Sequence, residues 1–447
     1  MSRRAPIILI ILLSVVLSLS QSLAREIKEF TLKNGLKVIL LEEHKAPVVT
    51  FQIWYRVGSR DEVIGKTGLS HLTEHMMFKG TKKHGKGEFS RIVSMNGGNE
   101  NAFTSKDYTA YFENFASDRI ELSLELEADR MTNLNVDPKE FLLERDVVKE
   151  ERRQSTDDDP YSLVVENMYA VTFLAHPYRS PVIGWMSDIN NLIRDDVYNH
   201  YRKYYIPNNA TIVVVGDFET EKLMKKIRVY FEKIPKAKVP PDVKIDEPEQ
   251  FGERRIYVKK EAQLPYLFAG YRAPNYRDED IYALTLLSNI LSSGKSSRFY
   301  RSLVYEKNLA LNAGGGYDGF SIGPELFYFY GMPRQGKTLD ELEKAIYEEI
   351  ERVKKEPVTD MELQKAKNQE EAAYILGQDS IFYQARQIGS METIGAGYKF
   401  MEGYVDQIRK VSKDDILRVA NKYLIEDRRT VGILVPVKSD EKEGGQR

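Results

Sequence analysis

Residues 195–218 read DDVYNHYRKYYIPNNATIVVVGDF, and residues 414–437 read DDILRVANKYLIEDRRTVGILVPV. In each stretch a helical pattern ends near a tyrosine and continues into a run of β-branched residues that is typical of a strand. The two stretches begin 414 minus 195, or 219, residues apart. Self-similarity at such a long interval indicates that the chain contains two copies of one structural unit.

A second pair of similar phrases supports this duplication. Tyr55-Arg56 recurs 216 residues later as Tyr271-Arg272, and the phrase Arg60-Asp61-Glu62 recurs 217 residues later as Arg277-Asp278-Glu279. Nearly constant intervals predict two homologous units of about 210 residues each. The proline- and charge-rich stretch AKVPPDVKIDEPEQFGERR, at 237–255, is expected to join them.

Each unit combines strands and helices. The segments LKVILLEEH at 36–44 and VVTFQIWYRV at 48–57 have the alternation of strands, whereas 121–134 and 339–356 have helical periodicity. Because strands come in neighbouring runs and helices come in blocks, the pattern favours an α+β fold with two α/β-layer units over a doubly wound sheet.

Composition excludes several classes of protein. The chain has 447 residues, is 42% hydrophobic and 30% charged, and can therefore bury a large core. A formal net charge of -2 gives no global field for nucleic acid or anionic lipid. Because there is no cysteine, disulfides and thiolate metal sites are excluded, and any metal must be held by histidine and carboxylate.

The N-terminus has the pattern of an export signal. Arg3 and Arg4 precede an apolar stretch at 7–16, and Ser22-Leu23-Ala24 offers small residues at the positions that a signal peptidase recognises. The stretch is short for a membrane span of about 20 residues. We therefore expect an exported protein, periplasmic in the first place, with a secreted form or an uncleaved N-terminal anchor as alternatives.

The motif His71-Leu72-Thr73-Glu74-His75 carries the chemistry of the first unit. On a helix the two histidines lie one turn apart on the same face, and the glutamate lies beside them. Two neutral imidazoles form a partial zinc site that needs a third ligand and an open position for water. The alternative is a pair of structural histidines that meet by accident.

A third ligand is expected on a helix that begins near Asp137. This residue is a good N-cap, Pro138 suits the first helical position, and the pattern continues to about Gln154. At 100° per residue, Glu144 and Glu151 share one stripe with Val147 and Val148, whereas Glu150 points 120° away.

A carboxylate on an apolar stripe is costly unless it is paired or binds a metal. Its position on the stripe selects Glu151 over Glu150 as the inward carboxylate, and the cost of burying it favours a metal ligand. The alternative that the periodicity leaves open is a carboxylate that pairs with a buried arginine.

Three segments together resemble a known family. They are GLSHLTEHMMFKGTKK at 68–83, NAFTSKDYTAYF at 101–112 and ERDVVKEERR at 144–153. The H-x-x-E-H motif is the inverzincin signature. The chain resembles the pitrilysin/insulinase family of zinc peptidases, in the shorter branch similar to the mitochondrial processing peptidase β subunit and bacterial secreted zinc proteases. The resemblance extends over essentially the whole chain after the signal.

The resemblance implies one Zn²⁺ per chain and a role for each residue of the site. By similarity, His71, His75 and Glu151 are the zinc ligands, Glu74 is the general base, and Glu144 is a carboxylate that supports the catalytic site. The edge strand that binds substrate peptide in the family would correspond to Asn101, Ala102, Phe103 and Thr104. From the residues alone, the segment NGGNENAFT at 96–104 could equally be an ordinary turn and edge strand.

One departure from the family concerns the second unit. Many relatives carry there an arginine and, seven residues later, a tyrosine that hold the substrate carbonyl. The corresponding positions here are Val304 and Leu311, which cannot donate a hydrogen bond, although Tyr305 and Tyr317 lie nearby. We therefore expect a related subunit without zinc ligands to supply these donors in a heterodimer, with a homodimer as the alternative.

These observations predict a zinc-dependent endopeptidase that acts on peptides or unfolded polypeptides. The alternative is a scaffold or assembly subunit that has kept the fold without turnover. The expected segments are a signal peptide (1–24), a catalytic zinc-binding domain (25–235), a linker (236–253), a homologous domain without zinc (254–438) and a disordered tail (439–447).

Overall fold

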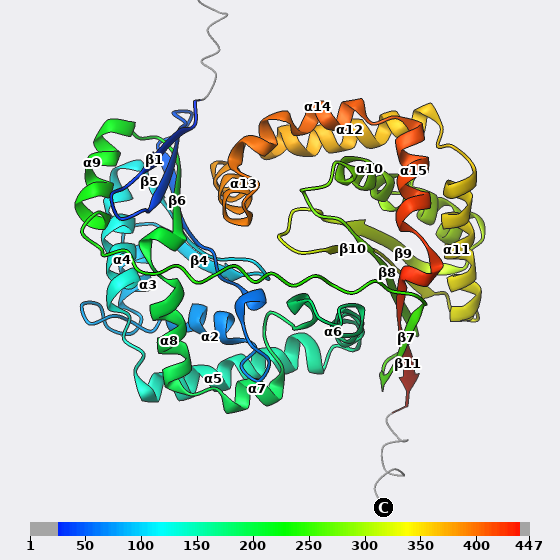
Figure 1. The fold of residues 1–447 in the computed structure, drawn as a ribbon, viewed down its shortest axis with the longest axis horizontal. Coiled ribbons are helices and arrows are strands. Elements are labelled where there is room, and N and C mark those ends of the chain that lie inside the picture. Colours follow the sequence, from blue (N-terminus) through cyan, green and yellow to red (C-terminus); the bar gives the residue numbers. More distant parts are fainter. Residues whose placement is uncertain (1–25, 439–447) are drawn as a thin grey trace, which may run out of the picture.

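The computed structural model describes residues 26–438, which form two α+β halves side by side (Figure 1). The predicted signal peptide at 1–24 and the predicted tail at 439–447 lie outside the described residues. Within residues 26–438, no helix has both the length and the apolar character needed to cross a membrane.

The first half is built on a six-stranded sheet with the order β1-β2-β6-β3-β5-β4. Its strands are β1 (Lys28–Thr31), β2 (Lys37–Glu42), β3 (Val48–Tyr55), β4 (Asn99–Thr104), β5 (Thr109–Ala116) and β6 (Ala210–Gly216). β2 pairs with β6 in parallel, and the other pairs are antiparallel. β4 is therefore an edge strand.

The second half repeats this topology on five strands in the order β7-β11-β8-β10-β9. They are β7 (Arg254–Glu261), β8 (Tyr266–Ala273), β9 (Ala310–Tyr317), β10 (Glu325–Pro333) and β11 (Arg429–Val437). β7 and β11 are parallel, and the remaining pairs are antiparallel, as in the first sheet without β1. The predicted α+β fold and its duplication are confirmed.

Helices cover both sheets (Figure 1). Those of the first half are α2 (Leu69–Met76), α3 (Glu88–Met95), α4 (Ile120–Asn133), α5 (Pro138–Arg152), α6 (Pro160–Thr172), α7 (Met186–Asn191), α8 (Arg194–Tyr204) and α9 (Thr220–Phe231). Those of the second half are α10 (Asp280–Ser292), α11 (Leu339–Lys355), α12 (Asp360–Gly377), α13 (Ile381–Ile394), α14 (Tyr404–Lys410) and α15 (Lys413–Tyr423). The two similar stretches of sequence form α8 with β6 and α15 with β11.

The predicted strands and helices are present, but the strands are buried differently from the expectation. The segments at 36–44 and 48–57 form β2 and β3, and those at 121–134 and 339–356 form α4 and α11. In β3 every residue after Val48 is buried, so the strand does not alternate between core and solvent. Both faces of this sheet must therefore be covered.

A helix from the other half covers the second face of the first sheet. Ala385 and Ile388 of α13 pack with Trp54 of β3 and Val213 of β6 in one apolar cluster. The approach is so close that a Cβ added at Gly389 would lie 2.2 Å from the Trp54 side chain.

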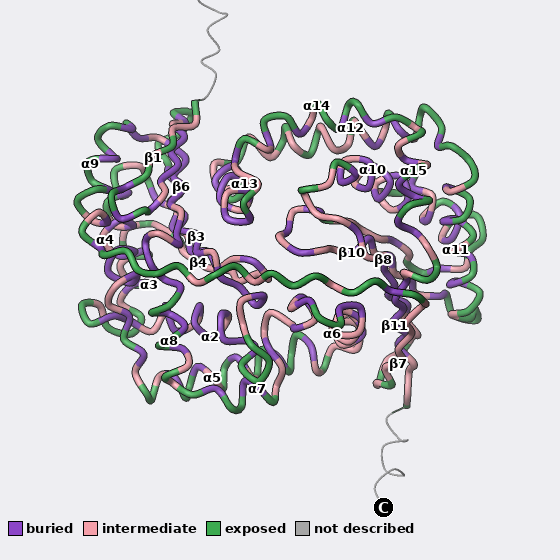
Figure 2. The backbone as a smooth tube through the Cα atoms, in the orientation of Figure 1, coloured by how far each residue is buried: buried purple, intermediate pink, exposed green. Residues whose placement is uncertain are grey.

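The second sheet is covered in the same way by α6 of the first half. Val164 and Met168 of α6 pack with Phe268 of β8 and Leu434 of β11. α6 and α13 occupy equivalent places in the two copies, so the halves exchange one helix each. This exchange joins the two halves through apolar cores, and the inner strands of both sheets are largely buried (Figure 2).

The linker crosses the molecule as a mostly exposed segment without helix or strand (Figure 2). It is nevertheless held in place, because the Glu247 carboxylate accepts hydrogen bonds from the backbone N–H groups of Leu174, Ala175 and His176 at 2.7, 2.9 and 2.8 Å.

Candidate functional site

Helix α2, which carries the H-x-x-E-H motif, begins in a tightly packed turn. Gly68 has φ of +83°, and a Cβ at this position would lie 2.4 Å from the carbonyl oxygen of Ile183. Glycine is therefore required here both by backbone conformation and by space. The Glu62 carboxylate accepts hydrogen bonds from the N–H groups of Gly68 (2.8 Å) and Ser70 (2.6 Å) and so caps the helix start.

The apolar face of α2 fixes the direction of its histidines. Leu72 and Met76 are fully buried in the core of the first half, and Leu69 is nearly so. His71 and His75 consequently point together away from this core, with ring centroids 4.6 Å apart.

Helix α5 brings the carboxylates from a distant part of the chain. Asp137 caps it by accepting hydrogen bonds from the N–H groups of Lys139 and Glu140, and Pro138 takes the first helical position, both as predicted. The α-helix ends at Arg152, slightly earlier than predicted, and continues as a π-helical turn at Arg153–Asp157.

The structure brings His71, His75 and Glu151 together. One ligand atom from each lies within 4.8 Å of the others. Glu151 oxygens lie 3.8 Å from His71 Nε2 and 3.4 Å from His75 Nε2. Glu150, by contrast, is exposed and bonds to Arg153 and Gln154.

The predicted inward stripe on α5 is buried at only two of its four residues. Val148 and Glu144 are buried, but Val147 is 49% exposed, and the Glu151 side chain is 45% exposed although it faces His71 and His75. The helix is rotated so that its carboxylates face α2 while Val147 faces solvent. Helical periodicity placed four residues on one stripe, but tertiary packing decided where the centre of that stripe lies.

Glu144 orients one histidine of the site. His75 Nδ1 donates to Glu144 Oε1 at 2.9 Å, and the Lys79 ammonium lies 2.6 Å from Glu144 Oε2. A bond at Nδ1 leaves Nε2 free to face Glu151, which is the arrangement that metal-binding histidines commonly adopt. The hydrogen bonds from His75 and Lys79 outweigh burial and lower the pKa of Glu144, so this carboxylate is ionised.

The two histidines have different proton affinities in the metal-free protein. Burial and the neighbouring His75 lower the pKa of His71 to about 4, so this imidazole is neutral. Burial also lowers the pKa of His75, but its hydrogen bonds to Glu144 and Glu151 outweigh burial and raise the pKa to about 9.

Glu74 lies beside the cluster without belonging to it. Thr104 Oγ1 of β4 donates a hydrogen bond to Glu74 Oε2 at 2.5 Å. Burial raises the pKa of Glu74, although the Thr104 hydrogen bond opposes this shift. A carboxylate with a raised pKa, held next to a possible metal position, is suited to accept and return a proton.

The residues predicted to bind substrate lie on the free edge of the first sheet. Ala102, Phe103 and Thr104 line one cavity of about 910 Å³ with His71, Glu74, His75 and Glu151. Asn101 does not line it. Its Oδ1 instead accepts a hydrogen bond from the Ala102 N–H at 2.8 Å, so this backbone donor is not used in pairing with β5.

The far wall of this cavity comes from α6, the 181–183 loop and one residue of the second half. The apolar and aromatic side chains there are Tyr161, Val165, Pro181, Val182, Ile183 and Tyr266. Glu166 also lines the cavity, but Arg152 neutralises it with two hydrogen bonds of 2.8 and 2.9 Å.

The two positions that depart from the family pattern lie outside this cavity. Val304 packs against the core of the second half from the π-helical turn at Tyr300–Glu306, and Leu311 is 54% exposed on β9. Tyr305 is largely exposed, and the Tyr317 hydroxyl donates to the carbonyl oxygen of Pro274 at 2.6 Å. Among the described residues, Tyr266 is the second-half side chain that lines the cavity.

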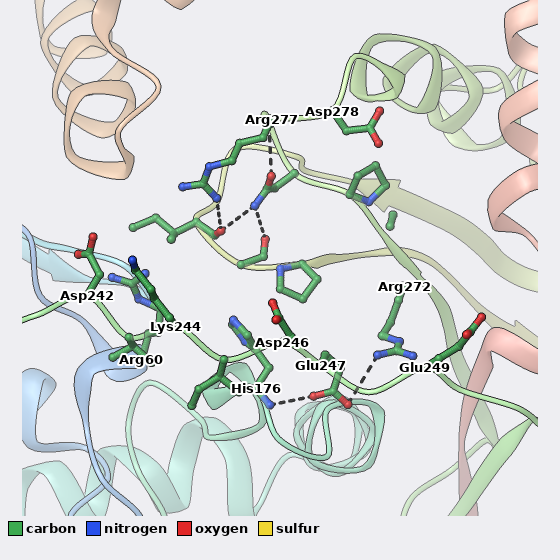
Figure 3. A pocket seen from close by; sticks show the side chains of 18 of the residues that line it. Arg60, His176, Asp242, Lys244, Asp246, Glu247, Glu249, Arg272, Arg277 and Asp278 are labelled. Carbon is green, nitrogen blue, oxygen red and sulfur yellow. Dashed lines mark hydrogen bonds and ion pairs between the residues drawn. The ribbon is translucent and has the colours of Figure 1, made fainter.

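A second cavity, of about 950 Å³, lies between the linker and both halves (Figure 3). Its walls carry charges of both signs that bond within the protein, such as Arg272 with Glu247 and Arg277 with the Ile322 carbonyl (Figure 3). Within residues 26–438, the group of candidate metal ligands found is His71, His75 and Glu151, so we assign the candidate active site to the cavity that these residues line.

The structure therefore defines a class of protein: a duplicated α+β fold in which the first copy carries a His-His-Glu cluster. The family model "Insulinase (Peptidase family M16)" matches residues 37–184, and "Peptidase M16 inactive domain" matches residues 191–370. The chain belongs to peptidase family M16, the insulinase family.

Relatives extend over almost the full length. The chain is 34% identical over 426 residues to "Zinc protease PqqE" of Helicobacter pylori, covering 93% of this chain and 94% of the relative. It is 26% identical over 402 residues to "Uncharacterized zinc protease YmxG" of Bacillus subtilis, covering 90% and 96%. The crystal structure of a protease from Helicobacter pylori superimposes with a TM-score of 0.89 at 34% identity, covering 92% of this chain and all of that one.

Some residues of the candidate site were not predicted from the sequence. Lys79 lies four residues after His75, a spacing that could have indicated its contact with the same carboxylate. Glu62 was identified only as part of a repeated phrase, without a role in the site. The wall residues Tyr161 and Tyr266 gave no signal, because their places in the site depend on packing between distant segments.

Proposed function

We propose that this protein is a zinc-dependent endopeptidase that hydrolyses peptides or unfolded polypeptides. The observation that carries the proposal is the convergence of His71, His75 and Glu151 within 4.8 Å, with Glu74 beside them. Two imidazoles and one carboxylate form the donor set of catalytic zinc sites, which keep a further position open. Two relatives are named as zinc proteases, which supports the same proposed function.

The residues divide the chemistry between them. His71, His75 and Glu151 would hold the zinc, and Glu144 would keep His75 in the correct tautomer. When bound, zinc supplies a Lewis acid that polarises the scissile carbonyl and lowers the pKa of water to about 7. Glu74 accepts the proton of the attacking water and returns it to the leaving amine nitrogen, so no covalent intermediate with the protein is needed.

Substrate recognition is assigned to the edge strand β4, including Asn101, Ala102, Phe103 and Thr104. An extended peptide that adds to this edge would form backbone hydrogen bonds next to Glu74. The Ala102 N–H is held by the Asn101 side chain and would become available when that exposed side chain moves. Backbone pairing makes recognition tolerant of peptide sequence, which suits unfolded substrates.

The decisive experiment compares wild type with Glu74→Gln for zinc content and peptide cleavage. We expect both proteins to retain zinc and the variant to lose cleavage by about 10²- to 10⁴-fold, because only the proton acceptor is removed. Glu150→Gln is the matched control, since it removes an exposed carboxylate next to Glu151 without touching the site. Unchanged cleavage by Glu74→Gln would overturn the assignment.

We also propose that the active form pairs with a related subunit that lacks zinc ligands, or else with a second copy. Val304 and Leu311 supply no hydrogen-bond donor to the cavity, and such donors commonly change the rate about 10²- to 10³-fold. Native mass spectrometry of the protein from its host, followed by assays of the isolated chain, tests this. Full peptidase activity in the isolated monomer would remove the need for a partner.

A second candidate function is a scaffold subunit without turnover. The observation in its favour is that residues 191–370, which include much of the second half, match a model described as an inactive domain. The presence of Glu74 beside all three candidate ligands favours the enzyme instead. Zinc binding without cleavage by wild type, even with its partner, would support the scaffold.

The cellular location is part of the proposal. The pattern of residues 1–24 supports export, to the periplasm in the first place. N-terminal sequencing of the protein from a periplasmic extract should begin at Arg25. An intact N-terminus in the membrane fraction would indicate an uncleaved anchor instead.

A further inference from the structure

An arginine of the second half reaches the edge strand of the first. The Arg386 guanidinium lies 5.4 Å from the centroid of the Phe103 ring, in a cation–π arrangement. It reaches this point because α13 packs on the first sheet, where Phe112 of β5 and Phe382 of α13 also meet with ring centroids 4.7 Å apart. The candidate peptide-binding strand therefore has a cation from the other half beside it.

The guanidinium of Arg386 has no carboxylate partner at ion-pair distance within the described part of the chain. The side chain is exposed and forms no hydrogen bond or ion pair with residues 26–438. Arg386 lines a cavity of about 310 Å³ together with two acidic residues, Asp318 and Glu370. Burial raises the pKa of Asp318, an effect that the charges of Lys106 and Arg386 oppose, and its carboxylate accepts a hydrogen bond from the Phe320 N–H. Glu370 accepts hydrogen bonds from Asn289 and Tyr404.

The alternation of β4 determines what a bound peptide would present to this cation. Ala102 and Thr104 face α2 and Glu74, whereas Phe103 faces α13 and Arg386. A peptide paired with β4 has side chains on the same two faces, and directly opposite residues have Cβ atoms about 4.5–5.5 Å apart. A peptide side chain opposite Phe103 would therefore lie within reach of the guanidinium.

We propose that Arg386 is a specificity-determining residue that favours an acidic side chain, Asp or Glu, in the bound peptide. The carboxylate would lie on the face of the peptide turned away from the candidate metal ligands. A guanidinium offers two parallel N–H donors to a carboxylate, and the Phe103 ring holds it at the strand edge. This inference rests on the proposed binding of peptide at β4.

Paired peptides that differ only by Glu or Gln at one position test the inference. One series places this change at successive positions around a cleaved bond and measures KM and kcat for wild type. The same peptides, labelled with fluorescein, are titrated by fluorescence anisotropy against zinc-loaded Glu74→Gln, which reports binding without turnover. We expect one position at which Glu is preferred about two- to fivefold, mainly in KM, with the preference falling as salt is added.

Variants of Arg386 assign the preference to this residue. In the Glu74→Gln background and in wild type, Arg386→Gln should abolish the Glu preference, and Arg386→Glu should replace it by a preference for Lys at the same position. Arg202→Glu is the matched control, because Arg202 is also exposed, forms no ion pair among the described residues and lies on α8. Circular dichroism melts check that each variant folds.

The outcomes separate this inference from the proposed function. Equal binding of the Glu and Gln peptides at every position, a preference that survives Arg386→Gln, or no peptide binding at all would overturn it. If wild type binds the peptides but cleaves none, even with its partner, the endopeptidase proposal fails. Binding of the Glu and Gln peptides to wild type and to Arg386→Gln can still be compared, so the role of Arg386 is tested separately.

Discussion

The Nδ1 atom of His75 lies 2.9 Å from Oε1 of Glu144, a residue 69 positions later in the chain. This single hydrogen bond joins α2 to α5 and sets the tautomer that turns Nε2 toward Glu151. It also explains why α5 carries two carboxylates two turns apart: one holds the histidine, and the other meets it at the candidate metal position.

Loss of this hydrogen bond should weaken zinc binding without removing a ligand. We expect Glu144→Ala to lower zinc affinity about 10- to 100-fold, because His75 loses its orientation and Lys79 loses its partner. Titration against a competing chelator measures the affinity. Glu150→Gln on the same helix should bind zinc as wild type does, and equal affinity for Glu144→Ala would contradict the role given to Glu144.

Zinc should stabilise the folded protein through the three candidate ligands. A ligand present at 100 times its dissociation constant raises the free energy of unfolding by about 2.7 kcal/mol. Wild type stripped with EDTA should therefore melt at a lower temperature than the zinc-loaded protein, and Glu151→Gln should show little difference between the two states. Differential scanning calorimetry measures this. A full zinc effect in Glu151→Gln would exclude this glutamate as a ligand.

The hydroxyl of Thr104 should set the acid limit of activity. Its hydrogen bond favours the ionised form of Glu74 and so opposes the rise in pKa that burial causes. Thr104→Val removes the bond, the pKa of Glu74 rises further, and the fraction of charged base at acidic pH falls. The acid limb of the kcat/KM profile should therefore move to higher pH.

Thr132→Val is the control for this shift, because it removes a hydroxyl that bonds only within α4. Its pH profile should match that of wild type. An unchanged acid limb in Thr104→Val would show that Glu74 does not govern it.

The close contact between α13 and the first sheet should contribute to the free energy of unfolding. A methyl group at Gly389 would lie 2.2 Å from the Trp54 side chain, which is fully buried and cannot move aside. Overpacking of this kind costs about 1–3 kcal/mol, so Gly389→Ala should lower the free energy of unfolding in urea by that amount. Gly403→Ala, where the added methyl meets no atom within 4 Å, should leave stability nearly unchanged. Equal stability of the two variants would contradict the tight contact.

The sequence alone determined the features that local periodicity and spacing encode. The duplication followed from similar stretches 219 residues apart, the direction of His71 and His75 followed from 3.6-residue periodicity, and the start of α5 followed from Asp137 and Pro138. These features depend on the geometry of one helix or one strand, which neighbouring residues specify.

Only the tertiary structure decided which distant segments meet. It placed Thr104 against Glu74, turned Val147 to solvent, exchanged α6 and α13 between the halves, and set Tyr266 and Arg386 beside the first half. Periodicity shows that a helix has an inward face but does not show which sheet that face covers. That choice depends on the complementary packing of two whole sheets, each of which buries both its faces.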